Sequence, residues 1–118
     1  MKHYRGSERI EYHIGKNNPT NIDLMLHDAR VLAVSVSGRE SGINDVEIEL
    51  DPRGAMATAH RLILGSCSFL RMDNLNNCWW IGEEVQGSSE GFVIDAECVS
   101  EQDDTRSLKI VCQRIILE

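Results

Sequence analysis

Apolar and polar residues alternate along most of this chain with a period of two, which is the pattern of a β-strand with one buried face. The clearest example is the segment 46–51, where Val46, Ile48 and Leu50 alternate with acidic residues. Pro52 and Gly54 follow it and indicate a turn. The same alternation predicts further strands in segments 22–26, 32–36, 62–64, 67–70, 78–81, 92–98 and 108–118, with polar connections at 37–42, 72–77, 87–91 and 100–107.

The segment 55–64 fits two structures. Its alanines permit a helix, but every neighbouring segment is strand-like, so we expect a strand. About seven or eight short strands with polar turns between them predict an all-β fold, an antiparallel β-sandwich or an open β-barrel, with room for one short helix. Residues 1–21 lack the alternation and are expected to form a polar N-terminal arm or an edge strand, and residues 22–118 a single antiparallel β domain.

Composition narrows the class of protein. The chain has 118 residues, of which 42% are apolar, and this is enough for one domain with a core. Lys and Arg number 12 against 19 Asp and Glu, a net charge of −7, which argues against nucleic-acid binding because phosphate contacts need cations. No apolar run is long enough to span a membrane, and the first residues do not resemble a secretory signal. We therefore expect a cytoplasmic location.

No motif in the sequence specifies a reaction. The four cysteines form no C-x-x-C pair, and we expect them to be reduced thiols of structural type; they are Cys67, Cys78, Cys98 and Cys112. Asp103 and Asp104 lack the spacing of a calcium loop, and the segment 65–69 is not a nucleophile elbow. We expect no enzyme activity, no cofactor and no metal, while His27 and Asp28 could act together as an oriented base.

The negative charge is concentrated in one part of the chain. Residues 45–104 hold 13 carboxylates against three arginines, a net of −10, whereas residues 1–21 have a net of +2. Four of the carboxylates, Asp45, Glu47, Glu49 and Asp51, alternate on one strand and must project from one face, and Asp95 and Glu97 do the same later. This row, with no cation inside it, is either a solvated outer face or a platform for a basic partner.

Trp79 and Trp80 are the most conspicuous aromatic feature, and as neighbours on a strand they point to opposite faces. Because Trp79 shares its parity with Ile81, we expect that pair to face the core. Trp80 would then lie on the outer face, either as a cover that meets solvent or a loop, or beside Glu83 and Glu84 as an aromatic anchor with an acidic rim.

Two segments carry a resemblance to a known class of proteins. Leu26-His27-Asp28-Ala29-Arg30-Val31-Leu32 places a hydrophobic-His-Asp motif before a strand, and Asp45-Val46-Glu47-Ile48-Glu49-Leu50-Asp51 follows with alternating acids. This resembles small bacterial all-β immunity proteins of polymorphic toxin or contact-dependent inhibition systems. The resemblance covers about residues 22–51 and implies a cytoplasmic binder that blocks one cognate toxin, often a cationic nuclease.

The sequence therefore predicts a non-catalytic protein-binding domain, in its most concrete form an immunity-type protein that neutralises a basic toxin. Its expected partner-binding residues are Asp45, Glu47, Glu49, Asp51, Trp80, Glu83 and Glu84. Two alternatives stay open. One is a small-ligand-binding β-barrel or an enzyme that uses His27 and Asp28. The other is a structural subunit that forms a homodimer through an exposed strand edge.

Overall fold

The computed structural model describes residues 9–14, 22–38 and 42–118. His3, most of the basic N-terminal segment and part of the 37–42 connection lie outside these residues. The described residues form strands and connections without a helix, and so contain no helix that is long and apolar enough to cross a membrane. The strands are β1 (Ile10–His13), β2 (Arg30–Gly38), β3 (Asn44–Asp51), β4 (Arg61–Cys67), β5 (Phe69–Met72), β6 (Trp79–Ser88), β7 (Gly91–Val99), β8 (Thr105–Cys112) and β9 (Arg114–Leu117).

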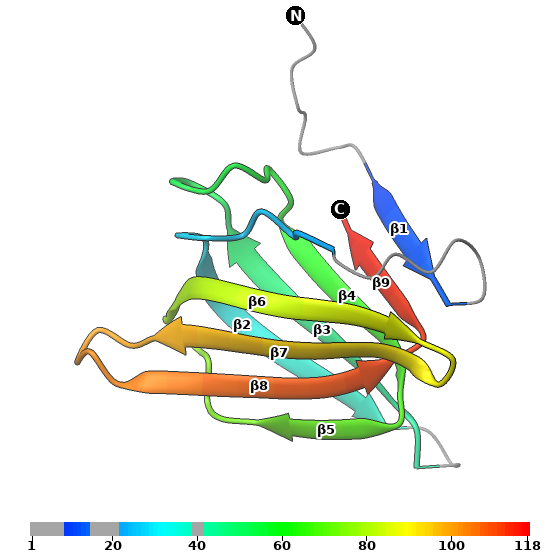
Figure 1. The fold of residues 1–118 in the computed structure, drawn as a ribbon. Coiled ribbons are helices and arrows are strands. Elements are labelled where there is room, and N and C mark those ends of the chain that lie inside the picture. The colour runs from blue at the N-terminus through cyan, green and yellow to red at the C-terminus, as the bar shows by residue number, and fades with distance from the viewer. Residues whose placement is uncertain (1–8, 15–21, 39–41) are drawn as a thin grey trace, which may run out of the picture.

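All strand pairs are antiparallel, in the order β1-β9-β4-β3-β2-β6-β7-β8-β5. Only one residue pair, Arg30 with Trp79, joins β2 to β6. At this corner the sheet folds over on itself, so that β6, β7, β8 and β5 lie in front of β2, β3, β4 and β9 (Figure 1). The all-β, antiparallel prediction is confirmed, and the two layers form a sandwich that is not closed into a barrel.

Two segments, 22–26 and 55–64, differ from the sequence expectation. Residues 22–26 keep their alternating burial but form no strand, because Leu24 gives its N–H to a side chain, Glu83, and Met25 has a positive φ of 57°. In the segment 55–64 a strand begins only at Arg61, and irregular chain precedes it. Within residues 1–21, β1 pairs with β9 and forms an edge strand. An edge strand and a polar arm were the two structures expected for this segment.

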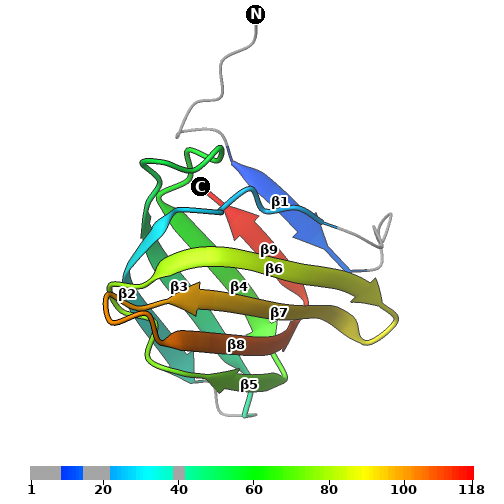
Figure 2. The ribbon, with the colours of Figure 1, turned by 60° about the vertical axis from the view of Figure 1, so that its left-hand side comes forward.

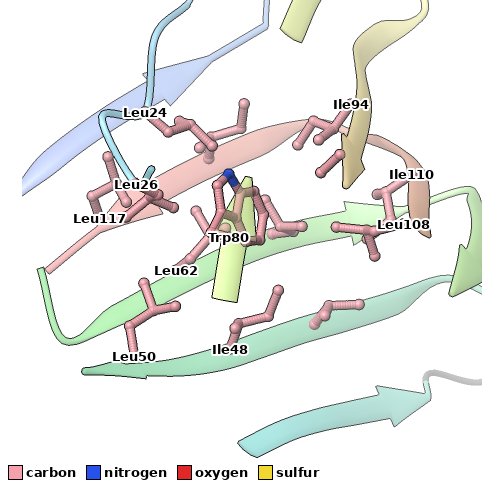
Figure 3. Packing of buried hydrophobic residues seen from close by; sticks show 14 of the residues in the cluster. Leu24, Leu26, Ile48, Leu50, Leu62, Trp80, Ile94, Leu108, Ile110 and Leu117 are labelled. Atoms are coloured by element: carbon pink, nitrogen blue, oxygen red, sulfur yellow. The ribbon is translucent and has the colours of Figure 1, made fainter. Parts of the chain in front are cut away.

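The core fills the space between the two layers. Figure 3 shows the Trp80 ring among leucine and isoleucine side chains that come from both layers and from the 22–26 segment. The alternation of β3, β7 and β8 places Ile48, Ile94 and Ile110 inward with no exposed surface. Burial of a large apolar side chain contributes about 1.5–3 kcal/mol, so this layer of contacts is what holds the sheet in its folded form.

Candidate protein-binding face

The β3 acidic row, Asp45, Glu47, Glu49 and Asp51, lies on the outer face of β3, because Val46, Ile48 and Leu50 occupy the inner face. The strand has no cation within the row, as the sequence shows, but a neighbouring strand supplies one. The Arg61 guanidinium lies 2.8 Å from Glu47 and 3.1 Å from the Glu118 side chain. Arg61 reaches Glu47 because it stands opposite Glu49 in the β3–β4 ladder, on the same outer face. Tertiary pairing thus supplies the counter-charge that β3 itself lacks.

The carboxylates at both ends of the row also have partners, an ion pair at Asp51 and a hydrogen bond at Asp45. Arg53 lies 2.6 Å from Asp51 across the 51–54 turn, and this contact lowers the pKa of the Asp51 carboxyl. At the other end, Asp45 accepts a hydrogen bond from the Ser66 N–H at 2.8 Å, where the chain has a positive φ of 55°. Asp51 therefore helps to stabilise the 51–54 turn, and Asp45 helps to stabilise the end of β4.

A second group of carboxylates, here the β6–β7 acidic face, consists of Glu84, Asp95 and Glu97. Glu84 stands directly opposite Asp95 in the antiparallel ladder, and Glu97 stands opposite Gly82. Like charges directly opposite each other in a sheet are destabilising. No salt bridge among the described residues reaches these three carboxylates, although Lys109 is the ladder neighbour of Asp95 on β8. The hydrogen-bond partner of Glu84 is the neutral Gln86.

A β-bulge between Trp80 and Gly82 sets this arrangement. The extra residue reverses the parity of β6, so that Glu83 and Val85 point inward and Glu84 points outward beside Asp95. Sequence reasoning included Glu83 and Glu84 in the site but left out Asp95 and Glu97. The signal for the missing pair was present in the i, i+2 spacing of two acids on an alternating strand.

Glu83 lies at the floor of an open cleft of about 380 Å³ between the 22–27 segment and β6. Its carboxylate accepts hydrogen bonds from the Trp80 Nε1–H at 2.8 Å and from the Leu24 N–H at 3.3 Å. Burial raises the pKa of Glu83, and these two donors offset part of that shift. The remaining cleft lining comes from Ile22, Asp23, His27, Gly82, Glu84 and Val85.

A second open cleft, of about 280 Å³, adjoins the first and shares Gly82, Glu83 and Glu84 with it. Its other lining residues are Ile81, which is 40% exposed, and the two acids of β7. Gly82 lines both clefts, and a Cβ atom placed there would meet nothing within 4 Å. The space above this glycine, where the two clefts adjoin, is therefore open. The β6–β7 acidic face is therefore a hollowed surface with an apolar side chain at its margin.

The prediction that Trp80 is an exposed anchor was wrong. Trp80 has no exposed surface, and its neighbour Trp79 is the half-buried one, with the Arg30 guanidinium 5.1 Å from the centre of its ring. The two tryptophans do point to opposite faces, but the face that sequence parity assigned to the core is the outer one. Burial of Trp80 requires a partner for its indole N–H, and Glu83 provides it.

The structure brings the other candidate groups together only in part. His27 lines the larger cleft, with its Nδ1 2.6 Å from the Ile81 carbonyl oxygen and its Nε2 3.6 Å from Asp28. Among the described residues that line this cleft there is no serine, threonine or cysteine. All four cysteines are buried free thiols, and burial raises the pKa of Cys98 to about 12. In the described part of the chain, no three His, Cys, Asp or Glu side chains are placed to hold a metal ion.

Comparisons of the whole chain with protein families, with curated proteins and with solved structures found no match.

Proposed function

We propose that this chain is a non-catalytic binding domain for a basic protein, and that the β6–β7 acidic face is the surface that contacts this partner. One observation carries the proposal. Glu84 and Asp95 stand directly opposite each other without a salt bridge to a described residue, so the folded chain keeps a repulsion that a cation would relieve. A basic partner would also be steered to this surface at long range.

The two clefts support the same proposal. A lysine or arginine side chain has an apolar stem and a charged end, and the larger cleft combines Ile22 and Val85 with the carboxylates of Asp23 and Glu83. The carboxylate of Glu83 is half-buried and already accepts two N–H donors. A cation in the cleft would stabilise its charged form, which burial disfavours. At a pH at which Glu83 is partly protonated, the binding of a basic side chain would release a proton from it.

The most concrete form of this function is an immunity-type protein that neutralises a basic bacterial toxin in the cytoplasm. Support for this finer proposal comes from the resemblance of residues 22–51 and from the acidic surface. We expect a gene beside the one for this chain to encode a protein with a short basic toxic domain. Expression of that domain should arrest growth, and co-expression of this chain should restore it. Growth arrest that persists would contradict the immunity proposal and leave the binding proposal to be judged separately.

The binding proposal is tested with decalysine as a defined basic probe. The triple variant Glu84→Gln/Asp95→Asn/Glu97→Gln removes three charges from the β6–β7 acidic face and should weaken binding by about tenfold or more at low salt. The matched control, Glu47→Gln/Glu49→Gln/Glu90→Gln, removes three charges elsewhere and should change the affinity by less than about threefold. Equal losses in both variants would show that only the total charge matters.

A second candidate function, binding of a small cationic ligand, is favoured by the convergence of Asp23, His27 and Glu83 on the larger cleft. Spermidine is a suitable probe for calorimetry. Binding that is abolished by Glu83→Gln but unaffected by the substitutions at Asp95 and Glu97 would favour this candidate. Loss of spermidine and decalysine binding together in the β6–β7 triple variant would favour the protein-binding function.

A further inference from the structure

β2 is a long strand with one open edge. Of its nine residues, Arg30–Gly38, all but the bulged Leu32 pair with β3, whereas the opposite edge pairs with β6 at Arg30 alone. The backbone groups of Val31 also face this edge, where they bond to Asn77 and Cys78. Beyond Val31 no described residue pairs with the open edge, which lies at the margin of the rear layer (Figure 2).

The ladder indicates which backbone groups face this edge. The Leu50 N–H bonds to His60, on the side of β3 away from β2. Along β3 the direction alternates, so Ile48 and Val46 also direct their backbone groups away from β2. Their ladder partners on β2 are Val34 and Val36, whose N–H and C=O groups therefore face the open edge. The residues between them, such as Ser35, use their backbone groups toward β3.

This edge lacks the protection that the other open edges have. From Val31 to Gly38 there is no charged residue and no proline, in a chain in which 26% of residues are charged. Leu32 and Val36 are each 46% exposed. The outer strands β1 and β5 are only four residues long and carry Glu11 and Arg71 respectively, which are devices that discourage edge-to-edge pairing. The β2 edge is long, neutral and apolar by comparison.

We propose that the β2 edge pairs antiparallel with the β2 edge of a second copy of this chain and so forms a twofold symmetric dimer. The distribution of charge favours a second copy of this chain over a basic partner at the β2 edge. Two copies with a net charge of −7 repel each other, and this repulsion is smaller at the β2 edge, which has no carboxylate of its own, than at either acidic face, although Glu47 stands opposite Ser35 one strand away. A basic partner is drawn to the acidic surfaces, while the β2 edge itself holds no carboxylate. An antiparallel match between identical strands is isologous, and it places the Val34 and Val36 side chains of both copies on one side of the joined sheet.

The test is the solution mass of the full chain by sedimentation equilibrium. We expect twice the 13.3 kDa of one chain. Val36→Pro removes an N–H that faces the open edge and spares the β3 ladder, so this variant should stay folded and weaken the dimer by at least about tenfold. Val36→Lys should do the same through charge. Ser89→Lys, in an exposed turn, adds the same charge as Val36→Lys elsewhere and should leave the dimer unchanged.

Two results would overturn the proposal. The first is the mass of one chain at every concentration up to about 100 μM, well above the Kd of a dimer of ordinary micromolar affinity. The second is a dimer that both Val36 variants leave intact, which would place its interface elsewhere. Circular dichroism of each variant establishes that it is folded, and Ser35→Pro, which removes an N–H used toward β3, should lose stability and so verify the assigned backbone direction.

Discussion

The two acidic surfaces of this molecule have similar sequences and different electrostatic environments. On β3, Arg61 and Arg53 pair with Glu47 and Asp51, so tertiary contacts offset much of the charge. On β6 and β7, Glu84 and Asp95 stand opposite each other without such a partner among the described residues. A row of carboxylates in a sequence is thus a poor guide to a binding surface until the neighbouring strands are known. Each surface has a cation in the ladder, Arg61 opposite Glu49 and Lys109 opposite Asp95. Of these two, only Arg61 forms a salt bridge among the described residues, and this distinguishes the two surfaces.

The largest expected effect is on the free energy of unfolding, and it concerns Trp80, which lies in the core on the inner side of β6. Trp80→Ala should lower the free energy of unfolding by about 3–5 kcal/mol, because it opens a cavity in the centre of the core and removes the indole donor to Glu83. Trp79→Ala, the matched control on the outer face, should cost about 1 kcal/mol. Urea denaturation measures both. Equal losses would contradict the assignment of Trp80 to the core.

The next effect compares the two surfaces in binding. Single charge reversal at Glu97, from Glu to Lys, should weaken decalysine binding more than the same reversal at Glu49, by a factor of about three to ten at low salt. The reason is that Glu49 lies near the Arg61 guanidinium, whereas Glu97 has no cationic partner among the described residues. Fluorescence titration over a range of salt concentrations measures this difference. A larger loss of affinity from the reversal at Glu49 would indicate that the binding surface lies on β3.

Stability should respond with opposite signs on the two surfaces. Glu84→Gln relieves the repulsion with Asp95 and keeps Lys109 opposite Asp95, so it should stabilise the chain by about 0.2–0.5 kcal/mol. Glu47→Gln removes the pair with Arg61 and should destabilise it by about 0.2–1 kcal/mol. Thermal unfolding at low salt gives both values, and high salt should reduce both. The same sign for the two variants would mean that the surfaces do not differ in the way proposed.

The smallest effect is the pH dependence that Glu83 contributes. Because burial raises the pKa of Glu83 in the folded chain, its contribution to stability is greatest when the carboxyl is protonated and falls as the pH rises from the unfolded toward the folded pKa. Glu83→Gln should therefore gain stability relative to the native chain as the pH rises to 7, and this gain should disappear in acid. Unfolding of both proteins at a series of pH values from acid to neutral measures it. A difference that does not vary with pH would contradict the assignment.

Much of the fold could be predicted from the sequence, because in β3, β7 and β8 the alternation of side chains and the burial agree residue by residue. The segment 22–26 shows where this reasoning stops. Its alternation predicts burial correctly, but whether it is a strand depends on hydrogen-bond partners elsewhere in the chain, and one of its N–H groups bonds to the Glu83 side chain. Periodicity reports which face is buried and contains no information about the neighbouring strand.

The candidate site was predictable to a smaller degree. Glu83 and Glu84 were predicted as site residues, but the β-bulge beside Gly82 separates their roles, since it turns one toward the core and the other toward Asp95. The bulge also explains why parity could not be carried through β6. No local pattern in the sequence marks it, because a bulge forms where the partner strand requires it. The inner position of Trp80 likewise depends on the opposite layer.

The sequence by itself therefore determined an all-β, antiparallel chain, the composition of its core and the excess of negative charge, because these follow from local alternation and from residue counts. Only the tertiary structure decided which carboxylates have counter-charges, which tryptophan is buried and which strand edge is left open. These properties depend on pairs of residues on different strands, such as Arg61 with Glu47 and Glu84 with Asp95. Electrostatic energy depends on the distance between such groups, and folding sets that distance.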